Sequence, residues 1–294
     1  MTQKDKEKFK GIIVPLSTPL NKDYNLDKSG MERLIEHVIK GEVNGVFVLG
    51  SCGEYPSFDD NESIEIVSFV AETVNRRLPV YAHATRNSTE HTQRIAKAFT
   101  EAGADYIVLT TPFYYSGITQ DDLKEHFKTI ASEYKVVLYN HPKTTKINIE
   151  VSTLEDLALK PNIIGVKESS ANFSKIKETA AIIPVLQGSD ELVLDSMKLG
   201  AKGGVPGLAN IYPCLFVKLF RAYQEKREEE AKICDSIIKE MSKVVYHSPK
   251  NAQVGVKQAL SAFGICSAIM RPPMAQINEE EAKKINDYIK KLVE

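Results

Sequence analysis

Residues 163–167, Ile163-Ile164-Gly165-Val166-Lys167, form a short apolar, β-branched run that ends in a lysine. A run of this length and composition is typical of a buried strand. Burial disfavours the ammonium form of a lysine and favours the neutral, nucleophilic amine. A neutral amine in an apolar pocket is the group that carbonyl chemistry through a Schiff base requires. The stretch therefore predicts a strand with a reactive lysine at its carboxyl end.

Similar short runs recur on both sides of this stretch, and a helical segment follows nearly every one. The other runs are 11–15, 45–49, 79–83, 105–109, 135–139, 184–187 and 203–205. The helical segments are 28–40, 59–75, 88–102, 119–133, 151–159, 172–182 and 190–199. Eight strands that alternate with helices predict an α/β fold of the (β/α)8 TIM barrel type. A doubly wound open sheet is the alternative, but the chain has no G-x-G-x-x-G turn.

Turn residues support these boundaries. Asp59 to Glu62 resembles a helix start with acidic residues in its first turn. Gly103 and Gly200 follow helical segments, as glycines at helix ends do.

The pattern changes after residue 210. Residues 211–246 indicate one or two helices, and 251–263 and 278–293 indicate two more. We therefore expect a catalytic barrel over residues 1–210. Residues 211–294 would hold the closing helix and a C-terminal helical extension that serves packing, oligomer contact or both.

Composition excludes several classes of protein. Lys and Arg number 38 against 39 Asp and Glu, which favours neither nucleic acid nor an anionic membrane as a partner. No apolar run reaches transmembrane length, and residues 1–10 lack the apolar core of a secretory signal. Four cysteines and six histidines show no spacing typical of metal ligands or disulfides, so we expect no metal and a reducing, cytoplasmic setting.

Reactive side chains follow several of the predicted strands. In a barrel of this type the chemistry lies at the carboxyl ends of the strands, so Ser51, Tyr114, Tyr139 and Lys167 should share one rim. Tyr139 precedes Lys167 by one strand and is the expected acid/base phenol. Ser51 and Tyr114 are candidates for passing the proton onward through their hydroxyls. The turn 50–53 offers backbone N–H groups for a carboxylate beside the ketone.

Each feature has a plainer alternative. Lys167 would be a rim lysine if it formed a salt bridge with Glu168 or another acidic residue. Tyr139 would be a core aromatic residue, and 50–53 only a tight turn. A second turn, 203–207, is a phosphate-loop candidate, but no basic residue follows closely. We expect its glycines, including Gly207, to allow a close backbone approach to substrate or to the barrel interior.

Four motifs resemble one known family. They are Gly50-Ser51-Cys52-Gly53-Glu54, Tyr139-Asn140-x-Pro142, Gly165-Val166-Lys167-Glu168 and Gly207-Leu208-Ala209-Asn210. In this order the chain, from Gly11 to about Leu260, resembles the dihydrodipicolinate synthase/N-acetylneuraminate lyase family of class I, pyruvate-dependent aldolases. The resemblance implies a (β/α)8 barrel with a C-terminal helical part and a homotetramer built as a dimer of dimers.

The resemblance also implies roles for the matching residues. Lys167 would form the Schiff base with pyruvate, Tyr139 would be the acid/base phenol, and Ser51 would belong to the proton relay. Tyr114 would reach into the site of a neighbouring subunit. The backbone carbonyl of Val205 would face the bound pyruvate. Beyond the covalent Schiff base, no cofactor is implied.

Three positions depart from the synthase pattern. Cys52 stands where the family usually has threonine, and a thiol is a weak donor, so the pyruvate carboxylate would depend on backbone N–H groups. Thr144 stands where the synthase has the arginine that binds its second substrate, and Lys143 or Lys146 would be an imperfect substitute for that arginine. Ser169 replaces the usual alanine and matches aldolases that contact a substrate hydroxyl.

These departures favour an aldolase that joins or cleaves pyruvate and an aldehyde, acting on a 2-keto-3-deoxy sugar acid or another 4-hydroxy-2-oxo acid. The alternatives are 4-hydroxy-tetrahydrodipicolinate synthase, N-acetylneuraminate lyase, a deoxy-keto acid dehydratase and a non-catalytic keto-acid-binding barrel. Asp190-Glu191 resembles the acidic pair that binds the polyol tail in the lyase, although Asp190 as a helix cap is an equal alternative.

Overall fold

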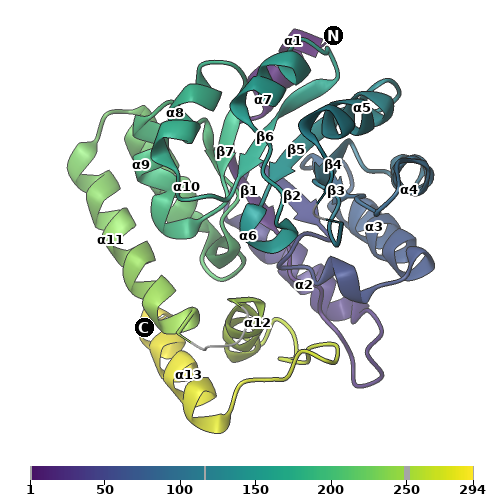
Figure 1. The fold of residues 1–294 in the computed structure, drawn as a ribbon. Coiled ribbons are helices and arrows are strands. Elements are labelled where there is room, and N and C mark those ends of the chain that lie inside the picture. Colours follow the sequence, from purple (N-terminus) through teal and green to yellow (C-terminus); the bar gives the residue numbers. More distant parts are fainter. Residues whose placement is uncertain (1, 116, 248–251, 294) are drawn as a thin grey trace.

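The computed structural model describes residues 2–115, 117–247 and 252–293. Eight parallel strands close into a barrel, each paired with the next along the chain (Figure 1). The ring closes between β8 and β1, where Gly11 pairs with Gly203. The strands are β1 (Gly11–Pro15), β2 (Gly45–Val48), β3 (Val80–His83), β4 (Tyr106–Thr110), β5 (Val136–Asn140), β6 (Ile163–Glu168), β7 (Val185–Gln187) and β8 (Gly203–Gly204). The predicted (β/α)8 barrel is confirmed.

Helices surround the barrel: α2 to α9 lie between successive strands, and α10 follows β8. They are α2 (Lys28–Lys40), α3 (Asp60–Val74), α4 (Thr89–Glu101), α5 (Gln120–Ala131), α7 (Val151–Ala158), α8 (Phe173–Ala180), α9 (Val193–Lys198) and α10 (Pro213–Gln224). Sequence analysis did not identify α1 (Thr2–Lys8) or the single turn α6 (Pro142–Thr145). Both are too short to show an amphipathic period.

The expected helix ends are present. Asp59 caps α3, and its side chain accepts a hydrogen bond from the Glu62 N–H, while the Glu62 carboxylate accepts one from the Asp59 N–H. Gly103 and Gly200 have φ of +103° and +106° just after α4 and α9, a conformation that a Cβ atom would disfavour.

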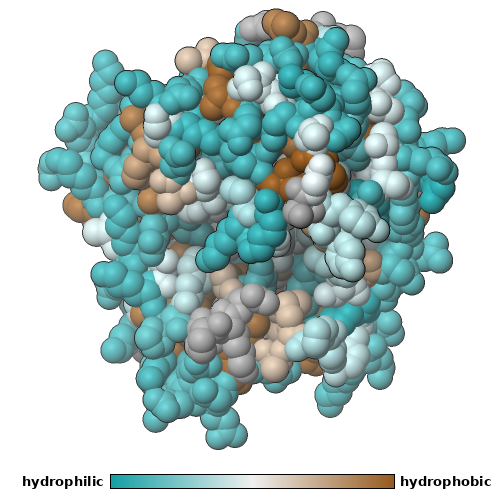
Figure 2. Space-filling view, viewed as in Figure 1, coloured by the Kyte–Doolittle hydropathy of each residue, from teal (hydrophilic) through white to brown (hydrophobic). Residues whose placement is uncertain are grey.

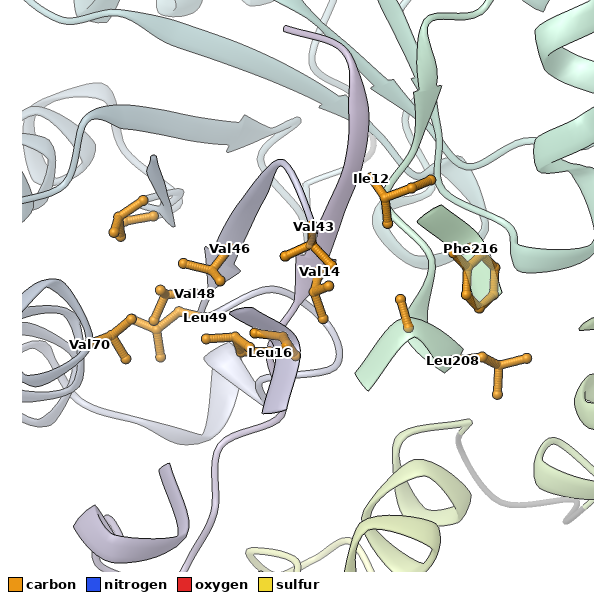
Figure 3. Packing of buried hydrophobic residues seen from close by; sticks show 14 of the residues in the cluster. Ile12, Val14, Leu16, Val43, Val46, Val48, Leu49, Val70, Leu208 and Phe216 are labelled. Carbon is orange, nitrogen blue, oxygen red and sulfur yellow. The ribbon is translucent and has the colours of Figure 1, made fainter. Parts of the chain in front are cut away.

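Two apolar cores lie on either side of the strands. The larger one fills the space between strands and helices, where Figure 3 shows Val48 and Leu49 near Val70 of α3. The smaller one fills the barrel interior and includes Phe9, which follows α1. A Cβ atom at Gly165 would lie 2.3 Å from the Phe9 ring. The glycine in β6, the strand that carries Lys167, therefore leaves space for the Phe9 ring in the barrel interior.

The C-terminal region forms an appendage beside the barrel (Figure 1). The segment predicted as one or two helices contains α10 and α11 (Glu228–Val245), and α12 (Ala252–Ala262) and α13 (Glu279–Val293) follow. The first residue of the predicted helix 251–263 lies outside the described residues. Across the described residues, no helix is both long and apolar enough to cross a bilayer. The face in Figure 2 is mostly hydrophilic, with hydrophobic residues in small, separate patches.

Candidate active site

Lys167 lies inside the barrel near the carboxyl end of β6. Only 5% of its surface is exposed. Its Nζ atom lies 4.1 Å from the centroid of the Tyr139 ring and 5.0 Å from that of Phe47. Tyr139 and Lys167 are register partners on adjacent strands, which is why both side chains enter the same space. The predicted pairing of these two residues is therefore present.

Glu168 does not pair with Lys167. Successive side chains on a strand point to opposite faces, and Glu168 points away from the barrel interior. Its buried carboxylate lies 3.2 Å from Nζ of Lys175 and accepts hydrogen bonds of 3.0 and 2.9 Å from the side chain of Asn140. The alternative of a Lys167–Glu168 salt bridge is wrong. Among the described residues no carboxylate forms a salt bridge with Lys167, and its amine lies beside the rings of Tyr139 and Phe47.

The hydroxyl of Ser51 reaches the phenol. Ser51 Oγ lies 3.4 Å from the hydroxyl oxygen of buried Tyr139, longer than an ordinary O–H···O bond. A small shift of either side chain would close the contact. In a site without substrate such contacts are commonly long and tighten when the reacting complex forms.

The turn after β2 presents backbone donors beside these groups. Gly53 N–H donates to Gly50 O at 3.0 Å and Glu54 N–H to Ser51 O at 3.2 Å. Among the described residues, no backbone carbonyl accepts from the N–H groups of Ser51 or Cys52. Two adjacent donors of this kind suit a carboxylate.

Cys52 contributes a protonated thiol to this turn. Burial raises the pKa of Cys52 to about 11, so the side chain is a thiol at neutral pH. The predicted reliance of a bound carboxylate on backbone donors follows from this weak side-chain donor.

Other predicted residues border the lysine. Ser169 is so close to Gly188 that a Cβ atom there would lie 2.0 Å from Ser169 Oγ and 3.0 Å from Lys167 Cε. Val205 is buried in the barrel interior, and its N–H donates to Gln187 O at 2.7 Å. These contacts place a hydroxyl and an apolar wall on the β7–β8 side of the amine.

Asp190 and Tyr246 form a polar pair that sequence analysis did not find. Asp190 Oδ1 accepts from Leu208 N–H at 2.7 Å, and Oδ2 accepts from the Tyr246 hydroxyl at 2.9 Å. A Cβ atom at Gly207 would lie 2.7 Å from the Tyr246 hydroxyl and 3.2 Å from Cys52 Sγ. The absence of a side chain at Gly207 therefore lets Tyr246 and Cys52 lie close to its backbone. The predicted approach of the Gly207 backbone to substrate stays a prediction.

The Asp190 carboxyl has a raised pKa. Burial raises the pKa of Asp190 to about 6, although hydrogen bonds from Leu208 and Tyr246 oppose the shift. The alternative of Asp190 as a helix cap is wrong, because its oxygens bond to Leu208 and Tyr246 instead. No local pattern signals the contact with Tyr246, which lies 56 residues away at the end of α11.

His83 is a second missed residue near the phenol. Its ring lies 6.2 Å from that of Tyr139 and 4.1 Å from that of Tyr55, centroid to centroid. Its Nδ1 atom lies 3.2 Å from Leu49 O and its Nε2 atom 3.3 Å from Thr110 Oγ1. Burial lowers the pKa of His83 to about 3, so the imidazole is neutral and serves as a wall of the site rather than as a proton store.

Two predicted site residues lie apart from the cluster. Tyr114 is 85% exposed, and its ring packs on Tyr115 at 5.2 Å. Among the described residues, Tyr114 forms no hydrogen bond or ring contact with Ser51 or Tyr139. Thr144 is exposed on α6. Among the described residues, no group of three His, Cys, Asp or Glu side chains is arranged to hold a metal ion.

Comparisons with known proteins agree with this geometry. A model of the dihydrodipicolinate synthetase family matches residues 8–292. The 4-hydroxy-tetrahydrodipicolinate synthase of Archaeoglobus fulgidus is 32% identical over 97% of this chain and 98% of its own length. The enzyme of that name from Methanocaldococcus jannaschii is 33% identical over 97% of this chain and 99% of its own length.

Solved structures are also similar. YagE, a prophage protein of the dihydrodipicolinic acid synthase family from E. coli K12, was solved in complex with pyruvate. It has a TM-score of 0.91 and 26% identity, covering 97% of this chain and 99% of its own. Dihydrodipicolinate synthase from Bacteroides thetaiotaomicron has a TM-score of 0.90 and 33% identity, covering 96% and 98%. The chain therefore belongs to the dihydrodipicolinate synthetase family and is a pyruvate-dependent lyase of the class I aldolase type.

Proposed function

We propose that this chain is a Schiff-base aldolase that joins or cleaves pyruvate and an aldehyde, with a 2-keto-3-deoxy sugar acid or another 4-hydroxy-2-oxo acid as substrate. One observation carries the proposal. Lys167 Nζ is buried 4.1 Å from the Tyr139 ring, and the Tyr139 hydroxyl lies 3.4 Å from Ser51 Oγ. An amine, a phenol and a hydroxyl in contact are the groups that iminium chemistry uses.

In the cleavage direction, Lys167 Nζ attacks the C2 ketone and forms a carbinolamine. Tyr139 donates a proton to the departing hydroxyl, so water leaves and a cationic iminium remains. The C4 hydroxyl then gives its proton to the Tyr139 phenolate, and the C3–C4 bond breaks. The aldehyde departs, and the bonding electrons enter the iminium to give an enamine.

The remaining steps return the enzyme to its starting state. Tyr139, which now holds the proton from the C4 hydroxyl, donates it to C3 of the enamine. Water then adds to the new iminium at C2 and gives a proton to the Tyr139 phenolate. Collapse of this carbinolamine releases pyruvate and restores the Lys167 amine. Ser51 is placed to exchange protons with Tyr139 during these steps. The N–H groups of Ser51 and Cys52 would hold the pyruvate carboxylate, and Ser169 would contact a substrate hydroxyl.

The second candidate is 4-hydroxy-tetrahydrodipicolinate synthase, which the names of the similar curated proteins favour. In this reaction the enamine attacks aspartate semialdehyde, whose carboxylate needs a cationic partner. The arginine that the synthase pattern provides is Thr144 here, and this residue is exposed on α6. Losing a bidentate clamp favours an aldehyde without that carboxylate.

Exposed Tyr114 supports a homo-oligomer, and a homotetramer built as a dimer of dimers is part of the proposal. Tyr114 and Tyr115 together present two large, exposed aromatic rings at the barrel rim. Exposed aromatic residues are enriched at interfaces between protein subunits.

A condensation screen tests the choice of substrate. The protein is incubated with pyruvate and either glyceraldehyde or aspartate semialdehyde, and product formation is followed for the wild type, Thr144→Arg and Thr144→Gln. We expect glyceraldehyde to react faster with the wild type. Thr144→Arg should raise the aspartate semialdehyde rate at least about tenfold because it restores a charge-assisted clamp, and Thr144→Gln should not. A wild type that prefers aspartate semialdehyde would replace the aldolase with the synthase.

A further inference from the structure

The carboxyl group of Glu54 is completely buried at the end of the turn 50–53. Its side-chain exposure is 0%, and its backbone has φ of +58°, the left-handed region that glutamate rarely adopts. A buried carboxylate is costly unless it is paired. The turn that carries Ser51 and Cys52 thus ends in a residue that needs a partner from elsewhere in the chain.

Lys257 of α12 provides that partner. Its Nζ atom lies 2.5 Å from Glu54 Oε1, and its side chain is 1% exposed. The same ammonium donates to Ile269 O at 2.7 Å. Burial lowers the pKa of Lys257, while the adjacent Glu54 carboxylate opposes that shift. The ion pair links the C-terminal extension directly to the turn after β2.

Two further contacts hold the same turn. The N–H of Arg271 donates to Glu54 Oε2 at 3.1 Å, so both carboxylate oxygens face the C-terminal region. The hydroxyl of Thr18 donates to Gly53 O at 2.8 Å from the loop after β1. The turn is therefore fixed from the barrel on one side and from the extension on the other.

A buried ion pair seldom adds net stability over an apolar pair of the same shape, because both charges lose their hydration. Its geometric effect is different, since each charge has only one favourable position. Here the ion pair fixes the position of Glu54, which is three residues after Ser51. The N–H groups of Ser51 and Cys52 lie in the same turn, and misplacing such groups by about 1 Å can cost about 100-fold in rate.

We propose that Lys257 is a positioning residue for keto-acid binding. By holding Glu54, it orients the turn whose N–H groups receive the pyruvate carboxylate. The inference rests on the proposed function, because it takes pyruvate as the ligand of this turn. It gives the C-terminal extension a part in the site, although the extension contributes no strand to the barrel.

The test measures pyruvate binding through covalent trapping. Wild type, Lys257→Met, Glu54→Gln and the double variant are incubated with increasing pyruvate and borohydride, and the adduct is quantified by intact mass. Each single variant should raise the half-saturating pyruvate concentration about tenfold, while saturating pyruvate restores the adduct. The double variant should do no worse than the worse single variant, because the two residues act as a unit.

Gln258→Met is the matched control. Gln258 is the next residue of α12, and its side-chain amide donates to Asn286 Oδ1 of α13 at 2.9 Å, so its loss should lower the melting temperature. The contacts of Glu54 remain in this variant. We expect its half-saturating concentration to stay within about twofold of the wild type.

The outcomes separate the inference from the proposed function. A wild type that traps no pyruvate contradicts the proposed function itself. A wild type that traps pyruvate, together with Lys257→Met and Glu54→Gln variants of unchanged half-saturation, overturns only the role of Lys257. An equal shift in Gln258→Met would also overturn it, because general destabilisation of the extension would then explain the effect. If Lys257→Met does not fold, Glu54→Gln, which preserves side-chain shape, decides.

Discussion

Tyr139 and Lys167 face each other across β5 and β6, with the lysine Nζ 4.1 Å from the centroid of the phenol ring. Because the two strands are parallel and in register, both residues project into the barrel at the same height. The phenol therefore lies beside the amine before any substrate arrives. This arrangement fits proton transfer to groups attached to the carbon that the amine attacks.

Replacing the phenol tests its role as acid and base. Tyr139→Phe should lower kcat by about 10²- to 10⁴-fold, the usual contribution of a general acid–base group, while the ring still packs on Lys167. Steady-state kinetics of aldehyde release measure the effect. Tyr106→Phe is the control, since Tyr106 belongs to the same interior core. Activity of Tyr139→Phe near that of Tyr106→Phe would contradict the assignment.

Subunit mixing tests whether Tyr114 acts in a neighbouring site. The Tyr114→Phe and Tyr139→Phe variants should each be impaired, and mixing them by unfolding and refolding together should restore activity. A mixed dimer then has one site with both tyrosines intact, so recovery should approach about a quarter of the wild-type value for random pairing.

Two further results bear on Tyr114. Tyr115→Phe, its exposed neighbour, should behave like the wild type. If mixing restores nothing while both homo-oligomers assemble, Tyr114 does not serve a partner's site.

The buried His83 should make the protein sensitive to acid. Burial lowers the pKa of His83 to about 3, whereas an exposed histidine titrates near 6.5. Below about pH 6.5 this histidine binds a proton in the unfolded chain but not in the folded protein. The free energy of unfolding therefore decreases as pH falls from 6.5 toward 3. The loss from this group between about pH 8 and pH 5 is about 2 kcal/mol.

Denaturant unfolding of His83→Gln measures this contribution. Glutamine retains a donor and an acceptor for Leu49 O and Thr110 Oγ1, and it does not titrate. The variant should lose less stability than the wild type over this pH range, whereas exposed His247→Gln should follow the wild type. Equal slopes for His83→Gln and the wild type would refute a neutral, buried His83.

Asp190 should have the opposite dependence on pH. Burial raises the pKa of Asp190 from 3.8 to about 6 in the folded protein. Because the folded state binds this proton more tightly, the stabilisation is present at low pH and is lost as pH rises through about 6. Relative to Asp190→Asn, the wild type should be about 2 kcal/mol more stable near pH 4.5 than near pH 7.

Unfolding curves of the wild type and Asp190→Asn at both pH values check this difference. Asp195→Asn, on the exposed surface of α9, is the control and should show little of it. A stability difference between the wild type and Asp190→Asn that does not change with pH would mean that Asp190 titrates normally.

Local patterns were sufficient for the barrel and for its central pair. Strands β1 to β7 are short runs that contain β-branched or aromatic residues, whereas β8 is only Gly203–Gly204. Parallel strands bring their carboxyl ends to one rim, so Lys167 and Tyr139 could be paired from their order in the sequence. Ser51 followed from the same rule. The position of Tyr114 outside the cluster could not be predicted by this rule. Its φ of +86° and its exposure depend on the conformation of the loop that carries it.

Contacts from the C-terminal extension could not be predicted. Tyr246 reaches Asp190, and Lys257 reaches Glu54, across long stretches of sequence with no periodic signal. Their meeting depends on how α11 and α12 pack beside the barrel. A lysine in an amphipathic helix is ordinarily a solvated residue, so only the packed structure distinguishes Lys257 from the others.

The central claim is that Lys167 forms the Schiff base, and trapping with a peptide map tests it most directly. The wild type is incubated with pyruvate and borohydride, digested and analysed by mass spectrometry, with Lys167→Met and Lys175→Met treated in the same way. We predict a reduced pyruvyl adduct on Lys167 in the wild type and in Lys175→Met, and none in Lys167→Met. An adduct on another lysine, or no adduct in folded wild-type protein, would contradict the account.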